Sequence, residues 1–311
     1  MLLVSALVLA QVGAAASGAG GGWSSARPPE CGTLDGGRAS NVWERAKAPE
    51  LRRYCDLLAS GASKLASSSA MLREVLTIAD DADKAMPGHA GPGVLRGRAL
   101  ARLGRPQEAL TALRDAKAKD ERALDDPASL LSWARVLAKT GSATEAAEAY
   151  RALLPRASTL TVTDRGAAAV EAGMLALARG TAGADEAIAI LRQARRDSQD
   201  VAQTVAVLAL ALALDRAGDK DEALAVLGDR GNVDPRPALG DARAREMLAT
   251  VGQAAEAHAL TAIALETSDP PAAKEAWKAY ADAAGKGPWV DHAKQHETSA
   301  SGRKPSRAGH R

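Results

Sequence analysis

The chain has 311 residues, a formal net charge of +2, aromatic residues at only 3% and no phenylalanine. So few large side chains do not fill the core of a β-sandwich, whereas an alanine-rich chain suits closely packed helices. The near balance of charge gives no bulk attraction to nucleic acid, so we expect no nucleic-acid partner.

The N-terminal segment is apolar. Residues 2–16 read LLVSALVLAQVGAAA, a run too short to cross a bilayer comfortably. The small residues at its end offer cleavage positions, so residues 1–16 are predicted to be a secretory signal peptide. No Lys or Arg stands at its start, so retention as an anchor stays open. We therefore expect an exported, periplasmic protein, with an inner-membrane anchor as the alternative.

Residues 17–39 are rich in Gly, Ser and Pro, a composition typical of a linker. Cys31 lies in this segment, and Cys55, on the first predicted helix, is the other cysteine of the chain. Two cysteines in an exported chain are expected to pair, and this disulfide would contribute about 3 kcal/mol in the chain-entropy model. Two free thiols remain the alternative, above all for a cytoplasmic chain.

Apolar periodicity, Gly and Pro place helices in pairs along residues 40–290, which are predicted to form one domain. The expected pairs are 49–65 with 68–86, 91–104 with 106–118, 127–140 with 143–154, 164–180 with 184–196, 200–217 with 219–227, and 238–251 with 253–267. Pro270 and Pro271 begin a further helix that covers the exposed end of the array. Residues 291–311 are predicted to be a basic, disordered tail.

A short phrase recurs along this domain: a Gly, three residues, a Glu and an Ala. It spans Gly104–Ala109, Gly141–Ala146, Gly218–Ala223 and Gly252–Ala257, with a looser copy at Gly183–Ala187. The alanines lie 34 to 41 residues apart. A period in this range indicates a solenoid built from one supersecondary unit.

The phrase has the chemistry of a helical hairpin. Its Gly can end the first helix in the left-handed conformation without steric cost. Ser142 and Asp219 each lie three residues before a Glu, which is the spacing of a capping box, and Pro106 suits the first turn of a helix. The Ala is small enough for two helices to approach closely. In a degenerate first hairpin, Val75 stands at the position that this Ala has in the other hairpins.

Further positions repeat with the phrase. A small residue stands seven before the Gly that ends each first helix, at Gly97, Ala134, Gly173 and Ala211. A large residue stands four after the Ala, at Leu113, Tyr150, Leu191 and Leu227. This order resembles the tetratricopeptide repeat family, which has two antiparallel helices per 34-residue unit. The resemblance covers about residues 49–285 and implies an all-α solenoid of stacked antiparallel helix pairs.

The copies also depart from the pattern. The third has an insertion near Thr181, and Gly228 interrupts the last turn of the fourth. The fifth has Arg245 where a small residue is expected and Thr261 where a large apolar one is expected. We therefore expect the superhelix to lose regularity after Gly228.

In this family the first helix of each pair lines a concave surface. The resemblance therefore implies a non-enzymatic scaffold that binds a protein or peptide partner there. The basic residues expected on that surface are Arg98, Arg102, Arg135, Lys139 and Arg216. Stacked cations of this kind suit an acidic peptide, because Arg binds carboxylates in bidentate fashion. The alternatives are a solvated face neutralised by nearby carboxylates and, for function, a membrane-anchored structural or assembly component of an envelope complex.

Catalytic and metal-binding patterns are weak, so no catalytic residue, cofactor or metal is predicted. His292 and His296 lie four apart and could share a helix face, but the intervening AKQ lacks the Glu of a zincin. We interpret them as a solvated helix end. The sequence GPGVLRG at 91–97 follows no predicted strand, which excludes a dinucleotide-binding loop there.

Overall fold

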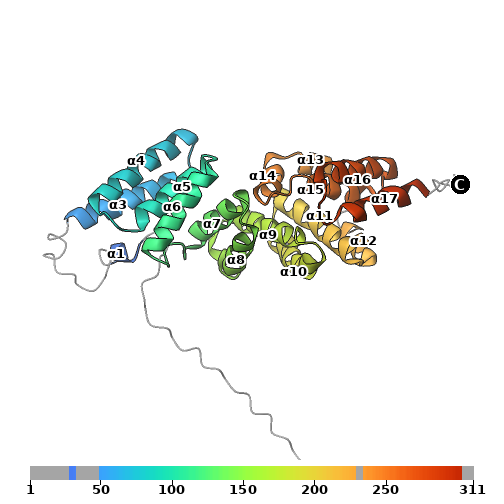
Figure 1. The fold of residues 1–311 in the computed structure, drawn as a ribbon, viewed down its shortest axis with the longest axis horizontal. Coiled ribbons are helices and arrows are strands. Elements are labelled where there is room, and N and C mark those ends of the chain that lie inside the picture. The colour runs from blue at the N-terminus through green and yellow to red at the C-terminus, as the bar shows by residue number, and fades with distance from the viewer. Residues whose placement is uncertain (1–27, 33–48, 229–233, 303–311) are drawn as a thin grey trace, which may run out of the picture.

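A computed structural model describes residues 28–32, 49–228 and 234–302 (Figure 1). These residues are mostly helical and include no strand, which confirms the all-α class. The predicted signal peptide, most of the linker and residues 303–311 of the tail lie outside the described residues. None of the described helices combines the length and apolar character needed to span a bilayer.

The paired helices follow the predicted order. They are α3 (Pro49–Lys64) with α4 (Ser69–Ala85), α5 (Gly91–Arg102) with α6 (Pro106–Lys119), α7 (Pro127–Lys139) with α8 (Ala143–Leu153), α9 (Val162–Leu177) with α10 (Thr181–Asp197), α11 (Asp200–Ala217) with α12 (Lys220–Gly228), and α14 (Ala242–Thr250) with α15 (Glu256–Leu265). The other elements are α1 (Pro29–Gly32), the 3₁₀ helix η1 (Leu154–Thr159), α13 (Arg236–Leu239), α16 (Pro270–Ala284) and α17 (Val290–Gly302).

The hairpins stack side by side. Each helix packs on its partner, and α4 packs on α5, α6 on α7, α8 on α9 and α10 on α11. The result is an elongated row that begins with α3 and ends with α17 (Figure 1). This arrangement confirms the predicted solenoid of antiparallel helix pairs.

A left-handed glycine ends the first helix of five hairpins. Gly104, Gly141, Gly180, Gly218 and Gly252 have φ angles of 74°, 85°, 72°, 92° and 70°. In four of these turns the next residue donates its N–H to the carbonyl five positions earlier: Arg105 to Leu100, Ser142 to Leu137, Asp219 to Leu214 and Gln253 to Leu248, at 2.8–3.0 Å. These are the hydrogen bonds of a Schellman motif, and they reverse the chain within a few residues.

Small residues let the two helices of a hairpin approach closely. A Cβ added at Gly97 would lie 2.5 Å from Cγ of Leu113, and one added at Gly173 would lie 2.5 Å from Cγ of Leu191. The phrase alanines Ala109, Ala146, Ala187 and Ala223 are buried at the facing positions, as is Val75 in the first hairpin. The seam predicted from the repeat is therefore present.

The helix starts match the prediction only in part. Pro106 opens α6, and Asp219 accepts a hydrogen bond from the Glu222 N–H at 3.2 Å. The Ser142 side chain makes no cap hydrogen bond, so the capping box predicted at that turn is wrong. The φ angle of Ser142 is −81° with ψ 60°, whereas an N-cap side chain requires extended backbone.

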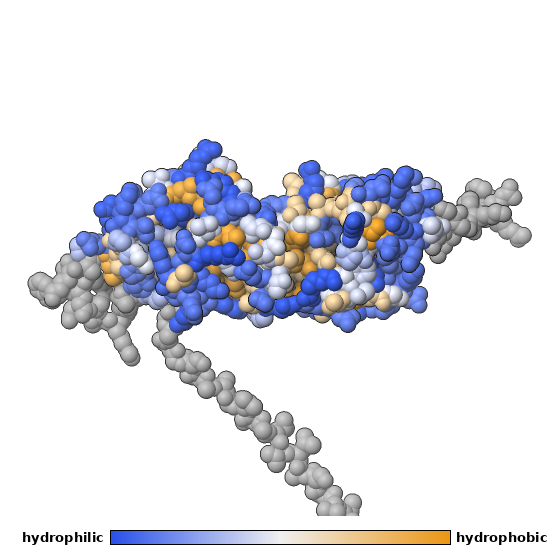
Figure 2. Space-filling model, in the orientation of Figure 1, coloured by the Kyte–Doolittle hydropathy of each residue, from blue (hydrophilic) through white to orange (hydrophobic). Residues whose placement is uncertain are grey.

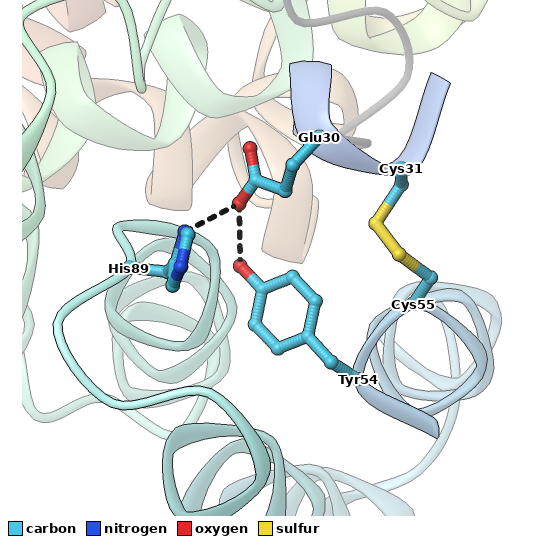
Figure 3. Close-up of a disulfide and its surroundings, with 5 residues drawn as sticks. All are labelled: Glu30, Cys31, Tyr54, Cys55 and His89. Atoms are coloured by element: carbon cyan, nitrogen blue, oxygen red, sulfur yellow. Dashed lines mark hydrogen bonds and ion pairs between the residues drawn. A yellow bond between two sulfur atoms is a disulfide. The ribbon is translucent and has the colours of Figure 1, made fainter. Parts of the chain in front are cut away.

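A disulfide joins Cys31 of α1 to Cys55 of α3 (Figure 3). Next to it, an Oε1 of Glu30 accepts a hydrogen bond from the Tyr54 hydroxyl at 3.0 Å and lies 3.0 Å from Nδ1 of His89. Burial, followed by the Glu30 charge, raises the pKa of Tyr54. A short helix within the segment predicted as linker is thus fixed against the first hairpin.

The C-terminal prediction needs correction. Residues 291–302, expected to begin a disordered tail, belong to α17, which packs on α16. Ala293 is fully buried, and the indole N–H of Trp289 donates to the Leu177 carbonyl at 2.8 Å. The segment has few apolar residues, so its periodicity is weak, and contacts to helices far back in the chain hold it instead.

The fifth repeat also differs from the others. The predicted helix 238–251 is divided into α13 and α14, and α15 begins at Glu256, three residues later than expected. Glu256 is therefore buried and Ala257 only half-buried, whereas the phrase glutamates Glu108 and Glu145 are exposed. The predicted loss of regularity after Gly228 is confirmed.

We predict that Gly97→Ala lowers the free energy of unfolding by about 1–3 kcal/mol, because the new methyl group overlaps Leu113. This loss occurs although Ala is the better helix former by about 1 kcal/mol. Gly228→Ala is the control, since no atom lies within 4 Å of its Cβ position. Urea unfolding measures both variants. Equal stabilities of the two would show that the seam is not closely packed.

Candidate functional site

The first helices of successive hairpins share one groove. A cavity of about 340 Å³ is lined by Arg102 of α5, Arg135 of α7, residues at the start of α9 and α11, and Arg243 and Met247 of α14. Helix α14 reaches this place because it packs on α7 and α9. Figure 2 shows apolar residues gathered over the middle of the row, between more hydrophilic surfaces at its ends.

The groove has mixed charge. Its cations are Arg102, Arg135 and Arg243, and its acidic residues are Asp164, Glu171, Asp200 and Glu246. Arg102 and Arg243 are exposed, and neither forms an ion pair with any residue that the structure describes. Asp200 and Glu246 are exposed as well. The groove therefore offers cationic and anionic groups to a ligand.

A buried carboxylate fixes the base of the groove. Glu171 is 2% exposed, and its Oε2 accepts hydrogen bonds from Nε of Arg135 and from the hydroxyl of Tyr150, both at 2.9 Å. Burial would lower the pKa of Arg135, but the Glu171 charge outweighs it and raises that pKa. Burial and then Glu171 raise the pKa of Tyr150. One carboxylate thus joins α7, α8 and α9.

The structure places the five predicted basic residues in different environments. Arg102 and Arg135 line the groove, whereas Lys139 is exposed at the end of α7 and is not part of the groove lining. The Arg98 side chain is 17% exposed and lies 3.7 Å from Asp126, and burial lowers its pKa. Of the five predicted basic residues, Arg102 and Arg135 therefore line the groove.

Arg216 requires a correction, because its side chain is fully buried and does not reach the concave surface. Its guanidinium pairs with Glu256 at 2.8 Å and lies 5.3 Å from the ring centre of Tyr280 and 5.1 Å from that of Trp289. The repeat spacing places this residue on an open face, but the helices that follow α12 cover it.

Sequence reasoning missed five charged residues of the groove, namely Asp164, Glu171, Asp200, Arg243 and Glu246. Arg243 and Glu246 come from α14, whose contact with α7 and α9 does not follow from the repeat spacing. Asp200 lies at the start of α11 with a φ of 54°, which is rare for a residue other than Gly. The sequence signal that could have indicated Asp200 as a groove residue is its polar side chain at a helix start, and that signal is weak.

A second cluster lies where α11 meets α17. Among the described residues, Asp215, His292 and His296 form the group of His, Cys, Asp or Glu side chains that could hold a metal ion, with ligand atoms within 4.8 Å of one another. The two histidine side chains are 18% and 11% exposed, so the interpretation as a solvated helix end is wrong.

Two carboxylates set the protonation of this cluster. Burial would lower the pKa of His296, but hydrogen bonds to Asp215 and Glu266 outweigh it and raise that pKa to about 9. Burial would raise the pKa of Asp215, yet hydrogen bonds from His292 and His296 lower it below its ordinary value. The His296 imidazole is thus protonated at neutral pH and pairs with the ionised carboxylate of Asp215.

No protein-family model and no curated protein sequence matches the chain. Among solved structures it is similar to YrrB, described as a TPR protein with an unusual peptide-binding site, at 16% identity over 70% of this chain and 97% of that chain, with a TM-score of 0.41. It is also similar to the TPR domain of P58(IPK), at 12% identity over 88% and 74%, with a TM-score of 0.32. Both are tetratricopeptide repeat structures, and the likeness concerns the fold alone.

We predict that Glu171→Ala lowers the free energy of unfolding by about 3 kcal/mol, because it leaves the Tyr150 hydroxyl without its acceptor and Arg135 with only the more distant Asp164, at 3.6 Å. Glu145→Ala is the matched control: Glu145 pairs with Arg114 on the exposed surface, and its loss should cost at most about 1 kcal/mol. Chemical denaturation compares the two. A cost for Glu171→Ala no larger than the control's would contradict the assigned role.

Proposed function

We propose that the protein is a non-enzymatic scaffold that binds a protein or peptide partner in the groove formed by the first helices of its hairpins. The observation that supports this is the groove lining, which draws on five helices and leaves Arg102 and Arg243 without an ion-pair partner among the described residues. Exposed cations in a concavity are available to a ligand, unlike those already neutralised within the chain.

The groove chemistry defines the partner segment. Guanidinium groups bind carboxylates in a planar, bidentate manner, so Arg102 and Arg243 suit an acidic side chain or a C-terminal carboxylate. Asp200 and Glu246, in the same lining, suit backbone N–H groups or a basic side chain. The partner segment that fits best carries an acidic residue among residues of mixed charge.

The proposed location is the periplasm of a bacterium. It is supported by the apolar run at residues 2–16 and by the Cys31–Cys55 disulfide, because disulfides persist mainly in oxidising compartments. The alternative is a membrane-anchored structural or assembly component that keeps its N-terminal segment. The mass of the mature N-terminus distinguishes a cleaved from an uncleaved chain.

Site-specific photo-crosslinking in the native compartment tests the binding surface. A crosslinking amino acid replaces either Gln199, which lines the groove, or Gln193. Gln193 is exposed on α10, the second helix of the hairpin that begins with α9. We expect discrete partner adducts from position 199 and none from position 193, because only the groove contacts the partner. Equal adducts from both positions, or adducts from position 193 alone, would rule out the groove.

Charge reversal then tests the proposed contacts. Arg102→Glu combined with Arg243→Glu should reduce the adduct from position 199 at least tenfold, since both carboxylate-binding groups are reversed. Arg73→Glu, at an exposed arginine of α4 that forms no ion pair with any described residue, should leave the adduct unchanged. An adduct that survives the double reversal would exclude these arginines as partner contacts.

A further inference from the structure

A histidine cluster lies at the far end of the row from the disulfide, outside the groove. Asp215 stands in the last turn of α11, Glu266 directly follows α15, and His292 and His296 lie one turn apart on α17. Trp277 of α16 packs beside them, with its ring centre 4.8 Å from that of His296. Helix α11 and three consecutive helices at the end of the chain thus bring titratable side chains together.

The inner groups of the cluster, namely Asp215, His292 and His296, meet at one carboxylate oxygen. An Oδ2 of Asp215 lies 2.7 Å from Nε2 of His292 and 3.1 Å from Nε2 of His296. Bonds of about 2.0–2.1 Å to a tetrahedral ion separate its ligand atoms by roughly 3.3 Å. To admit an ion, the Asp215–His292 separation would widen by roughly 0.6 Å and the Asp215–His296 separation by roughly 0.2 Å, and all three ligand atoms already lie within 4.8 Å of one another. The two histidines stand in successive turns of one helix, so they move together.

An outer pair of hydrogen bonds orients His296. Its Nδ1 lies 2.5 Å from Oε1 of Glu266, and the indole N–H of Trp277 donates to the same oxygen at 2.8 Å. Metal-binding histidines commonly donate their second ring N–H to a carboxylate, which fixes the tautomer and turns the other nitrogen to the ion. Glu266 is placed to do this, so Nε2 of His296 is directed at Asp215 and His292.

The cluster opens onto a cavity of about 490 Å³. Besides the inner groups, its lining includes Gly218, Leu224 and Ile263. Sites with three protein ligands keep a coordination position for water or a ligand, whereas closed structural sites use four. The cavity provides room for that fourth ligand.

We propose that Asp215, His292 and His296 form a binding site for a divalent first-row transition-metal ion, with Glu266 as a positioning residue and one coordination position facing the cavity. Two imidazoles and one carboxylate suit ions such as Zn²⁺, Co²⁺ or Ni²⁺ rather than Mg²⁺ or Ca²⁺. A bound ion ties α17 to the end of α11 and so fastens the last helix onto the array.

Calorimetric titration of the full-length protein, prepared without a histidine tag, with Zn²⁺ tests the site. We expect saturable binding of one ion per chain. His292→Ala should weaken it at least tenfold, and Glu266→Gln should weaken it about tenfold to a hundredfold without changing the stoichiometry. His258→Ala is the matched control, because His258 is exposed on α15 and lies outside the cluster; it should bind Zn²⁺ as the parent protein does.

Two further measurements keep the outcome decisive. Circular dichroism establishes that each variant is folded, and Asp215→Asn, which keeps the side-chain size, replaces any variant that is not. Visible absorption of the Co²⁺ complex should show imidazole coordination that His292→Ala alters and His258→Ala does not. Absence of saturable binding, or equal affinity in the parent and the folded cluster variants, would show that these residues form only an ion-pair network.

Discussion

The left-handed glycine turn is the constraint on which the row of hairpins depends. At φ angles of 70–92°, residues other than Gly are strained. In four of the five turns, a backbone hydrogen bond from the next residue to the carbonyl five positions earlier closes the end of the first helix. The reversal brings Gly97 onto Leu113 and Gly173 onto Leu191 at a distance that admits no Cβ. Turn and seam are therefore coupled: a wider turn would separate the helices, and a larger residue in the seam would strain the turn.

Both candidate sites include residues from the irregular end of the row. In the fifth repeat the phrase glutamate, Glu256, is buried and pairs with Arg216 beneath Tyr280 and Trp289. The changed path takes α14 onto α7 and α9, which completes the groove, and the helices that follow carry the histidines of α17 back to α11. The regular hairpins thus supply most of the groove lining. The irregular end adds Arg243 and Glu246 to that lining and brings His292 and His296 beside Asp215.

Sequence alone was sufficient for the helix pairs, whose predicted and observed bounds agree to within three residues for the first five pairs. These features depend on local chemistry, namely glycine turns, proline starts and small residues at fixed spacing. It was insufficient for Arg216 and His292, because their partners lie 40 and 77 residues away. It was also insufficient for Arg135, whose charge is cancelled by Glu171 of the neighbouring hairpin. Which cations stay exposed depends on how hairpins pack, which no single repeat encodes.

Amide hydrogen exchange at single-residue resolution tests the glycine-turn account most directly. The N–H groups of Arg105, Ser142, Asp219 and Gln253 follow the turn glycines and donate to carbonyls five residues earlier. The account predicts that all four exchange far more slowly than unprotected amides, at rates close to those within the adjoining helices. Exchange of these four amides at the rate of an unstructured peptide, in a chain whose helices are protected, would contradict it.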